Sequence, residues 1–125
     1  MKTLKINQFD KKDEEIVDAL ISLGMRKPAA RMLTYIQQVN ESTSVELELG
    51  TGLRQPEVSI AAKQLDERDW INEREEKKAG KGRPYKIYSL KVEFKDIIGE
   101  LETERKKSDV EAQEKIERLK ELGLK

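Results

Sequence analysis

Neither cysteine nor histidine occurs in this sequence of 125 residues. Their absence excludes disulfide bridges, thiolate nucleophiles and imidazole bases. A zinc site would have to consist of carboxylates alone, which is an unusual ligand set for zinc. We therefore expect no metal and no cofactor. An enzyme is the least favoured class, because the only groups available for acid–base chemistry are dispersed charged side chains.

Long apolar runs are missing as well. No stretch approaches the roughly 18 apolar residues that a membrane-spanning helix needs, and the first residues lack the apolar core of a signal peptide. These patterns predict a cytoplasmic protein without membrane contact. Only 5% of the residues are aromatic and 36% are hydrophobic, so the chain can build one small core.

Charge is abundant but balanced. Charged residues make up 40% of the chain, and 25 basic side chains stand against 25 acidic ones. Net charge therefore gives no sign of a nucleic-acid partner, and only the distribution of charge along the chain can give one. The segment KKAGKGRP at 77–84 is notable, because its basic residues have no acid among them and glycines separate them.

Hydrophobic spacing predicts two helices in the first 40 residues. The first lies at 13–24, where acidic residues crowd the first turn and Gly24 suits a left-handed cap after the last. The second begins near Pro28, a residue that fits the first turn of a helix.

Two further helices follow. The third begins with the capping-box pair Thr43 and Glu46, and Gly50 and Gly52 are expected to close it within about two turns. The fourth covers 54–69, with a proline that is tolerable only near its start.

The remainder of the chain predicts a hairpin and one long helix. WINEREEK at 70–77 and YKIYSL at 85–90 have the composition and alternation of strands, and the basic loop joins them. From residue 92 onward the chain reads as a charged helix of about thirty residues with apolar positions at coiled-coil spacing. A second capping-box pattern, SDVE at 108–111, leaves open a break there, although a continuous helix is favoured.

Three helices, of which the last two are separated by a glycine-containing turn, followed by a hairpin, are typical of a winged helix-turn-helix. TGLRQPEVSIAAKQLDERDWI at 51–71 resembles the turn and recognition helix of MarR-, ArsR- and TrmB-type transcriptional regulators. LGMRKPAARMLTYI at 23–36 looks like the second helix of TrmB-like regulators, the group with the closest similarity. GKGRPYKIYSL at 80–90 is similar to the wing of several of these families, and the resemblance covers roughly residues 13–91.

The resemblance implies a mainly α fold with a small β-hairpin and a long C-terminal helix. Residues 1–91 would form a winged helix-turn-helix DNA-binding domain, and residues 92–125 a dimerisation helix. Double-stranded DNA would be the partner, with helix 54–69 in the major groove and the wing at 77–86 on the minor groove or the backbone.

Six residues of the recognition helix are candidates for DNA contact: Arg54, Gln55, Glu57, Ser59, Ile60 and Lys63. Gln55 is suited to an adenine edge, Lys63 to guanine or phosphate, and Ile60 to a thymine methyl group. Glu57 suits a cytosine amine, or instead the free backbone N–H groups of the first helical turn, and both interpretations stay open.

Five basic residues of the wing are expected to contact DNA: Lys77, Lys78, Lys81, Arg83 and Lys86. The glycines between them let the backbone approach a phosphate, and an arginine held by a following proline suits a narrow minor groove. The competing interpretation is an ordinary solvated hairpin tip.

Backbone contacts are expected from four more residues: Arg26, Lys27, Arg31 and Thr43. The first three lie at the start of the second helix, where positive charge and free N–H groups can hold a phosphate. Ordinary surface charge explains them equally well, and a capping role explains Thr43. Trp70 is expected to anchor the core rather than to stack on a base.

The last helix is expected to pair two copies of the chain through an apolar set: Phe94, Ile97, Ile98, Leu101, Ile116, Leu119 and Leu122. A homodimer would hold two recognition helices about 34 Å apart, which matches one turn of DNA. The competing interpretation is a monomer whose last helix folds back onto its own first helix.

The sequence thus favours a homodimeric, sequence-specific DNA-binding transcriptional regulator of the cytoplasm, associated with the nucleoid. The alternative is a winged-helix protein-interaction module of a larger transcription or chromatin assembly, because fold does not fix function. No set of residues marks an effector site, and the sequence does not distinguish a repressor from an activator.

Overall fold

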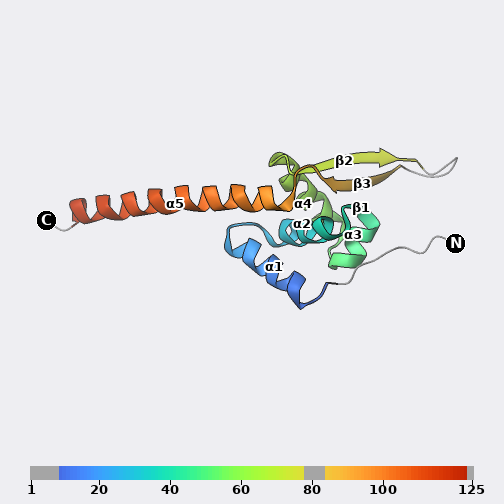
Figure 1. Cartoon of the computed structure of the whole chain (residues 1–125), viewed down its shortest axis with the longest axis horizontal. Helices are drawn as coiled ribbons and strands as arrows, with labels where there is room; N and C mark the ends of the chain where they lie inside the picture. Colours follow the sequence, from blue (N-terminus) through green and yellow to red (C-terminus); the bar gives the residue numbers. More distant parts are fainter. Residues whose placement is uncertain (1–8, 78–83, 124–125) are drawn as a thin grey trace. The chain divides into compact units, whose positions relative to one another are not determined.

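Helices make up most of the computed structural model, which describes residues 9–77 and 84–123. Five helices and three strands follow one another along these residues (Figure 1). Their bounds are α1 (Lys11–Ser22), α2 (Lys27–Val39), β1 (Glu41–Thr43), α3 (Ser44–Thr51), α4 (Gln55–Glu67), β2 (Ile71–Glu76), β3 (Tyr85–Leu90) and α5 (Phe94–Gly123). The chain divides into two units, residues 1–93 and residues 94–125. The predicted fold class, mainly α with a small sheet and a long last helix, is confirmed.

Helix α2 is the central helix of the first unit. Its apolar side chains recur at helical spacing, and Met32, Leu33 and Ile36 are fully buried. The helix packs against α1, α3 and α4. Removing each such side chain from water contributes about 1.5–3 kcal/mol. The burial of α2 therefore holds the other helices of this unit in position.

Helix α1 begins with a reciprocal cap. The Asp13 amide donates to Asp10 Oδ1 at 2.9 Å, and the Asp10 amide donates to Asp13 Oδ2 at 3.0 Å. The Asp13 carboxylate is buried, and it also accepts a hydrogen bond from the Gln38 side chain of α2. At the other end, Gly24 has a φ of +102°, which confirms the predicted left-handed cap.

Helix α3 begins at the predicted capping box. The Glu46 amide donates to Thr43 Oγ1 at 3.1 Å, and the Thr43 amide donates to Glu46 Oε1 at 2.9 Å. Gly52, with a φ of +77°, ends the helix as predicted. Gly50 does not, since it lies inside α3, and a Cβ atom there would overlap the buried ring of Tyr35. This glycine is needed for close packing rather than for a turn.

The sheet has one strand more than the sequence predicts. All three strands are antiparallel in the order β1–β3–β2, so β3 is central, with Ile87 opposite Thr43 of β1 and Arg74 of β2. The predicted hairpin of β2 and β3 is confirmed. Strand β1 was missed because it is short and polar and because Thr43, its last residue, is also the cap of α3.

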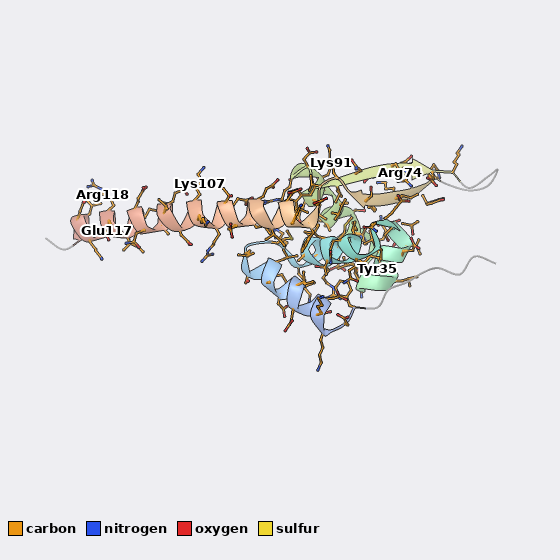
Figure 2. The ribbon with its side chains drawn as sticks, viewed as in Figure 1. Tyr35, Arg74, Lys91, Lys107, Glu117 and Arg118 are labelled. Carbon is orange, nitrogen blue, oxygen red and sulfur yellow. The ribbon has the colours of Figure 1, made fainter. Side chains whose placement is uncertain are left out.

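An exposed cluster of charges joins the two outer strands. Arg74 of β2 is labelled in Figure 2. It donates to both carboxylate oxygens of Glu41 in β1, at 3.0 and 2.7 Å, and to Glu76 Oε1 at 3.2 Å. The hydrogen bond from Arg74 lowers the pKa of Glu41. Tyr85 Oη donates to the other oxygen of Glu76 at 3.2 Å. Exposed pairs of this kind add little to stability.

Trp70 joins α4 to the sheet. Its side chain is fully buried, as the sequence predicts for a core anchor, and the Arg68 guanidinium lies 4.0 Å from its ring centroid. The Trp70 carbonyl accepts a hydrogen bond from the Lys91 amide at 2.8 Å. This bond joins the two ends of the hairpin, and the Trp70 amide donates to the Leu65 carbonyl of α4 at 3.2 Å.

Helix α5 forms the second unit and runs unbroken from Phe94 to Gly123, so the possible break at Ser108 does not occur. Ion pairs within the helix include Arg105 with Asp109 at 3.2 Å and Arg118 with Glu121 at 2.9 Å. Pairs of this kind add about 0.3–0.5 kcal/mol each to a polar helix. Within residues 9–77 and 84–123, no helix is long and apolar enough to cross a membrane.

Candidate nucleic-acid interface

Helix α4 has one buried face and one exposed face. Val58, Ala61, Ala62 and Leu65 are buried and fix the rotation of the helix about its axis. This burial leaves five of the six predicted contact residues exposed, namely Arg54, Gln55, Ser59, Ile60 and Lys63. The packing of α4 thus presents its polar face, as the sequence predicts.

Two of the exposed residues are joined to each other. Gln55 Nε2 donates to Ser59 Oγ at 3.0 Å, one helical turn apart. The bond holds the amide along the helix and leaves its carbonyl oxygen and second N–H free of this contact. An amide fixed in this way can present a donor and an acceptor together, which is the pattern that pairs with an adenine edge.

Glu57 has a local structural role. Its Oε1 atom accepts a hydrogen bond from the Arg54 amide at 3.0 Å, at the beginning of α4. The side chain is half-buried, and its charge lies at the N-terminal end of the helix dipole. The sequence leaves two roles open for Glu57, and the geometry favours the role of helix cap.

Ile60 is the apolar member of the exposed face, with 56% of its surface accessible. It lies between polar neighbours, one residue after Ser59 and three before Lys63. An isolated exposed apolar side chain needs no special explanation, but it can contact a thymine methyl group or a protein partner.

A shallow hollow of about 260 Å³ lies where α4 meets the hairpin. Its walls are Ser59, Ala62, Lys63 and Asp66 of α4 together with Glu73, Lys86 and Tyr88 of the sheet. Lys86 Nζ lies 3.9 Å from the Glu73 carboxylate. Burial, together with the Glu73 charge, raises the pKa of Tyr88 to about 12. The hollow therefore combines two lysines with two carboxylates and is not uniformly positive.

The wing is only partly within the described residues. Lys78, Lys81 and Arg83 lie outside them, and of the five predicted wing contacts Lys77 and Lys86 are described and exposed. In the described part of the hairpin these two lysines and Arg74 stand against three glutamates, Glu73, Glu75 and Glu76. Positive charge on the wing therefore depends on the basic residues of its tip.

The four predicted backbone contacts separate into two groups. Arg26 and Lys27 are exposed at the start of α2. Arg31 points inward, and its guanidinium bonds the carbonyl of Thr51 and the carboxylate of Glu14. Thr43 Oγ1 is used in the cap of α3. The geometry therefore gives Arg31 and Thr43 structural roles and leaves the first two available to a phosphate.

The seven residues predicted for dimerisation lie on α5. Ile97 and Leu101 are buried in the single chain, and Phe94 is half-buried. The rest of the set is exposed, namely Ile98, Ile116, Leu119 and Leu122. A helix surface with four large apolar side chains in water is the feature of α5 that a second chain would cover.

Four residues of the hollow are not among the predicted contacts, namely Ala62, Asp66, Glu73 and Tyr88. Alternation along YKIYSL puts Tyr88 on the same side of β3 as Lys86, so its place beside this lysine could be predicted from the sequence. For Asp66, only the packing of α4 against the sheet brings its charge next to this side of the hairpin. Among residues 9–77 and 84–123, no cluster of acidic side chains could hold a metal ion.

Comparison with solved structures finds a similar fold in NadR, crystallised in complex with 4-hydroxyphenylacetate. The match has a TM-score of 0.51 and 17% sequence identity, and it covers 98% of this chain and 94% of that chain. The similarity shows the fold, which is a MarR-like winged helix. No protein-family model and no curated protein match the chain. The closer resemblance to TrmB-like regulators stays a prediction.

Proposed function

We propose that this protein is a sequence-specific double-stranded DNA-binding transcriptional regulator that inserts α4 into the major groove. The observation that carries the proposal is the exposed polar face of α4, on which Gln55, Ser59 and Lys63 stand clear of a fully packed opposite face. A helix of this kind, preceded by a tight turn and followed by a wing, is how winged helices read DNA. The MarR-like fold is consistent with this role.

Each exposed residue has a role in the proposal. Gln55, held by Ser59, reads an adenine edge, and Ile60 contacts a neighbouring thymine methyl group. Arg54 and Lys63 contact guanine or phosphate. Outside α4, phosphates are held by Arg26 and Lys27 and by the five basic residues of the wing: Lys77, Lys78, Lys81, Arg83 and Lys86.

The proposal includes a homodimer formed through the C-terminal segment at residues 92–125, which contains α5. One winged helix makes too few base contacts to select a site in a genome, and pairing doubles the recognised sequence. Two copies related by a two-fold axis would read a pseudo-palindrome. Such a protein acts at the nucleoid, in the cytoplasm.

The direct test is selection of bound sequences from a random duplex pool, followed by fluorescence anisotropy on the selected site. We expect an enriched motif with two-fold symmetry and binding that weakens steeply with salt, since each neutralised phosphate contributes a slope of about −0.9. A pool that remains random after selection, with no measurable binding at low salt, would refute the function.

A second candidate is a protein-interaction module of a transcription or chromatin assembly. Two observations favour it: the mixed charge of the described hairpin, and the exposed apolar side chains Val45, Leu49 and Ile60 on α3 and α4. The substitution Ile60→Ser separates the two functions. If the protein reads DNA, the variant has an altered preference at one base pair of the site. If the protein is an interaction module, the variant binds its protein partner more weakly and DNA preference does not change.

A small-molecule effector is a further part of the proposal that can be tested directly. NadR was crystallised with an aromatic acid, 4-hydroxyphenylacetate. A thermal-shift screen of aromatic acids against this chain tests the same ligand class. A ligand of the folded state raises the melting temperature in a concentration-dependent way.

A further inference from the structure

One line of α5 carries large apolar residues at both ends and an arginine and an alanine in the middle. Ile98, Arg105, Ala112, Ile116 and Leu119 follow one another at spacings that keep them on one side of the helix. The three large apolar side chains among them are about half exposed or more: 50% for Ile98, 46% for Ile116 and 68% for Leu119. We call these five residues the α5 seam.

The seam determines which orientation of a second α5 is acceptable. In a parallel pair, each seam residue faces its own copy. Arg105 would then face Arg105 of the other chain in the middle of the contact. The flanking positions would be like-charged too, because Glu104 would approach Asp109 and Lys115 would approach Lys120 of the other helix. Parallel pairing therefore places like charges together at Arg105 and at the two flanking pairs, although the apolar residues of the seam would still meet.

An antiparallel pair removes these conflicts. With the two-fold axis between Ser108 and Asp109, Ile98 lies opposite Leu119 of the second chain, and Arg105 lies opposite Ala112. Ile98 of each helix is thus covered by Leu119 of the other, and Ile116 lies opposite Leu101. The small alanine leaves room for the arginine stem, whose charged end keeps its ion pair with Asp109.

The flanking charges of the antiparallel pair are also complementary. Glu104 of one helix lies beside Lys115 of the other, and the two-fold axis makes this pair occur twice. Lys95 and Lys120 approach each other near the ends, where both side chains are exposed to water and screened by salt. The balance of charges along the seam therefore favours the antiparallel orientation.

We infer that α5 pairs with a second copy of itself as an antiparallel two-helix coiled coil centred between Ser108 and Asp109. The inference rests on the proposed function only for the role of the coiled coil, which is to join two winged helices in one assembly. The attachment points at Phe94 would lie about 44 Å apart along the rod, from the rise of 1.5 Å per residue. The spacing of the two DNA half-sites would thus depend on the length of α5.

Because the chain has no cysteine, single spin labels can be placed without background. Lys107→Cys and Glu121→Cys both lie on the side of α5 away from the seam and are exposed. In an antiparallel pair, the two labels at 121 are offset along the axis by about 38 Å, whereas those at 107 are offset by only about 5 Å. Dipolar electron spin resonance of the full chain should therefore give a much longer separation at 121 than at 107.

Equal separations at both positions would mean a parallel pair and would overturn the inference. So would a monomer, which gives no dipolar coupling and a mass of 14.5 kDa by light scattering. Binding of the unlabelled protein to a selected duplex is measured separately. Loss of that binding refutes the proposed function alone, and equal separations in a protein that binds DNA refute the antiparallel pair alone.

A charge reversal gives a second, independent readout. Glu104→Lys places two lysines together in the antiparallel pair and should weaken dimerisation about three- to fivefold. The double variant Glu104→Lys with Lys115→Glu should restore it. In a parallel pair, Glu104→Lys would instead approach Asp109 and tighten the dimer, so a tighter dimer in sedimentation equilibrium would overturn the inference.

Discussion

The guanidinium group of Arg31 on α2 donates two hydrogen bonds to the main-chain carbonyl of Thr51, from Nε at 2.9 Å and from Nη2 at 2.8 Å. Thr51 is the last residue of α3, where a helix leaves carbonyls without an internal partner. The same guanidinium pairs with Glu14 of α1 at 3.0 Å and covers the Phe9 ring at 4.5 Å from its centroid. One side chain therefore ties α1 and α2 to the turn that precedes α4.

From this arrangement we expect Arg31→Ala to lower the free energy of unfolding by about 2 kcal/mol, because charge-assisted hydrogen bonds to a partly buried carbonyl are lost. Urea denaturation followed by circular dichroism measures the change. Arg26→Ala is the matched control, since Arg26 is exposed on the same helix and should change stability by less than about 0.5 kcal/mol. Equal stability of the two variants would show that Arg31 does not support the turn.

The contact between Gly50 and Tyr35 gives a second prediction. Gly50→Ala improves helix propensity by about 1 kcal/mol, but its methyl group would overlap a buried aromatic ring that cannot move aside easily. We expect net destabilisation of about 1–2 kcal/mol. Gly99→Ala is the control, because it lies inside α5 with open space around the new methyl group. That variant should be neutral or more stable, and a stabilised Gly50→Ala would contradict the packing argument.

The glycines also show where sequence reasoning succeeds. Gly24 and Gly52 were predicted as helix ends because each follows a periodic apolar pattern, and both have positive φ. Gly50 gives the same local signal but lies inside a helix, since its role depends on Tyr35, fifteen positions earlier in the chain. A local pattern contains no information about such a contact between two helices.

The candidate interface follows the same rule. The rotation of α4 could be predicted, because Val58, Ala62 and Leu65 recur at helical spacing and leave the polar residues on the other side. The inward direction of Arg31 could not, since its partner is a main-chain carbonyl of another helix, and every residue has such a carbonyl. A basic residue can therefore be predicted at an interface from its charge, but the prediction fails where the fold places an acceptor for it inside the protein.

Tyr88 should make stability depend on alkaline pH. Burial and the nearby Glu73 charge raise its pKa from 10.0 to about 12, so the folded protein retains a proton that the unfolded chain loses. Stability from this group is complete below pH 10 and falls as the pH rises toward 12, by on the order of 1–2 kcal/mol.

The measurement is the urea midpoint at several pH values between 8 and 11, for the natural protein and for Tyr88→Phe. The phenylalanine variant cannot ionise at this position, so its stability should fall less steeply with pH. Lysines also titrate in this range, but they do so equally in both proteins. The difference between the two slopes of stability against pH therefore reports Tyr88 alone. Parallel pH profiles would show that Tyr88 is not responsible.

Base reading and phosphate binding should separate on α4. Gln55→Ala removes the amide that Ser59 orients, so we expect a loss of about 1–3 kcal/mol at one base pair of the selected site and little change elsewhere. Lys63→Ala should instead weaken binding to all sequences and, if it contacts a phosphate, reduce the salt slope by about 0.9. Anisotropy titrations against the selected duplex and its single-base variants, each at several salt concentrations, measure both effects. A Gln55→Ala protein with an unchanged base preference would show that Gln55 does not read a base.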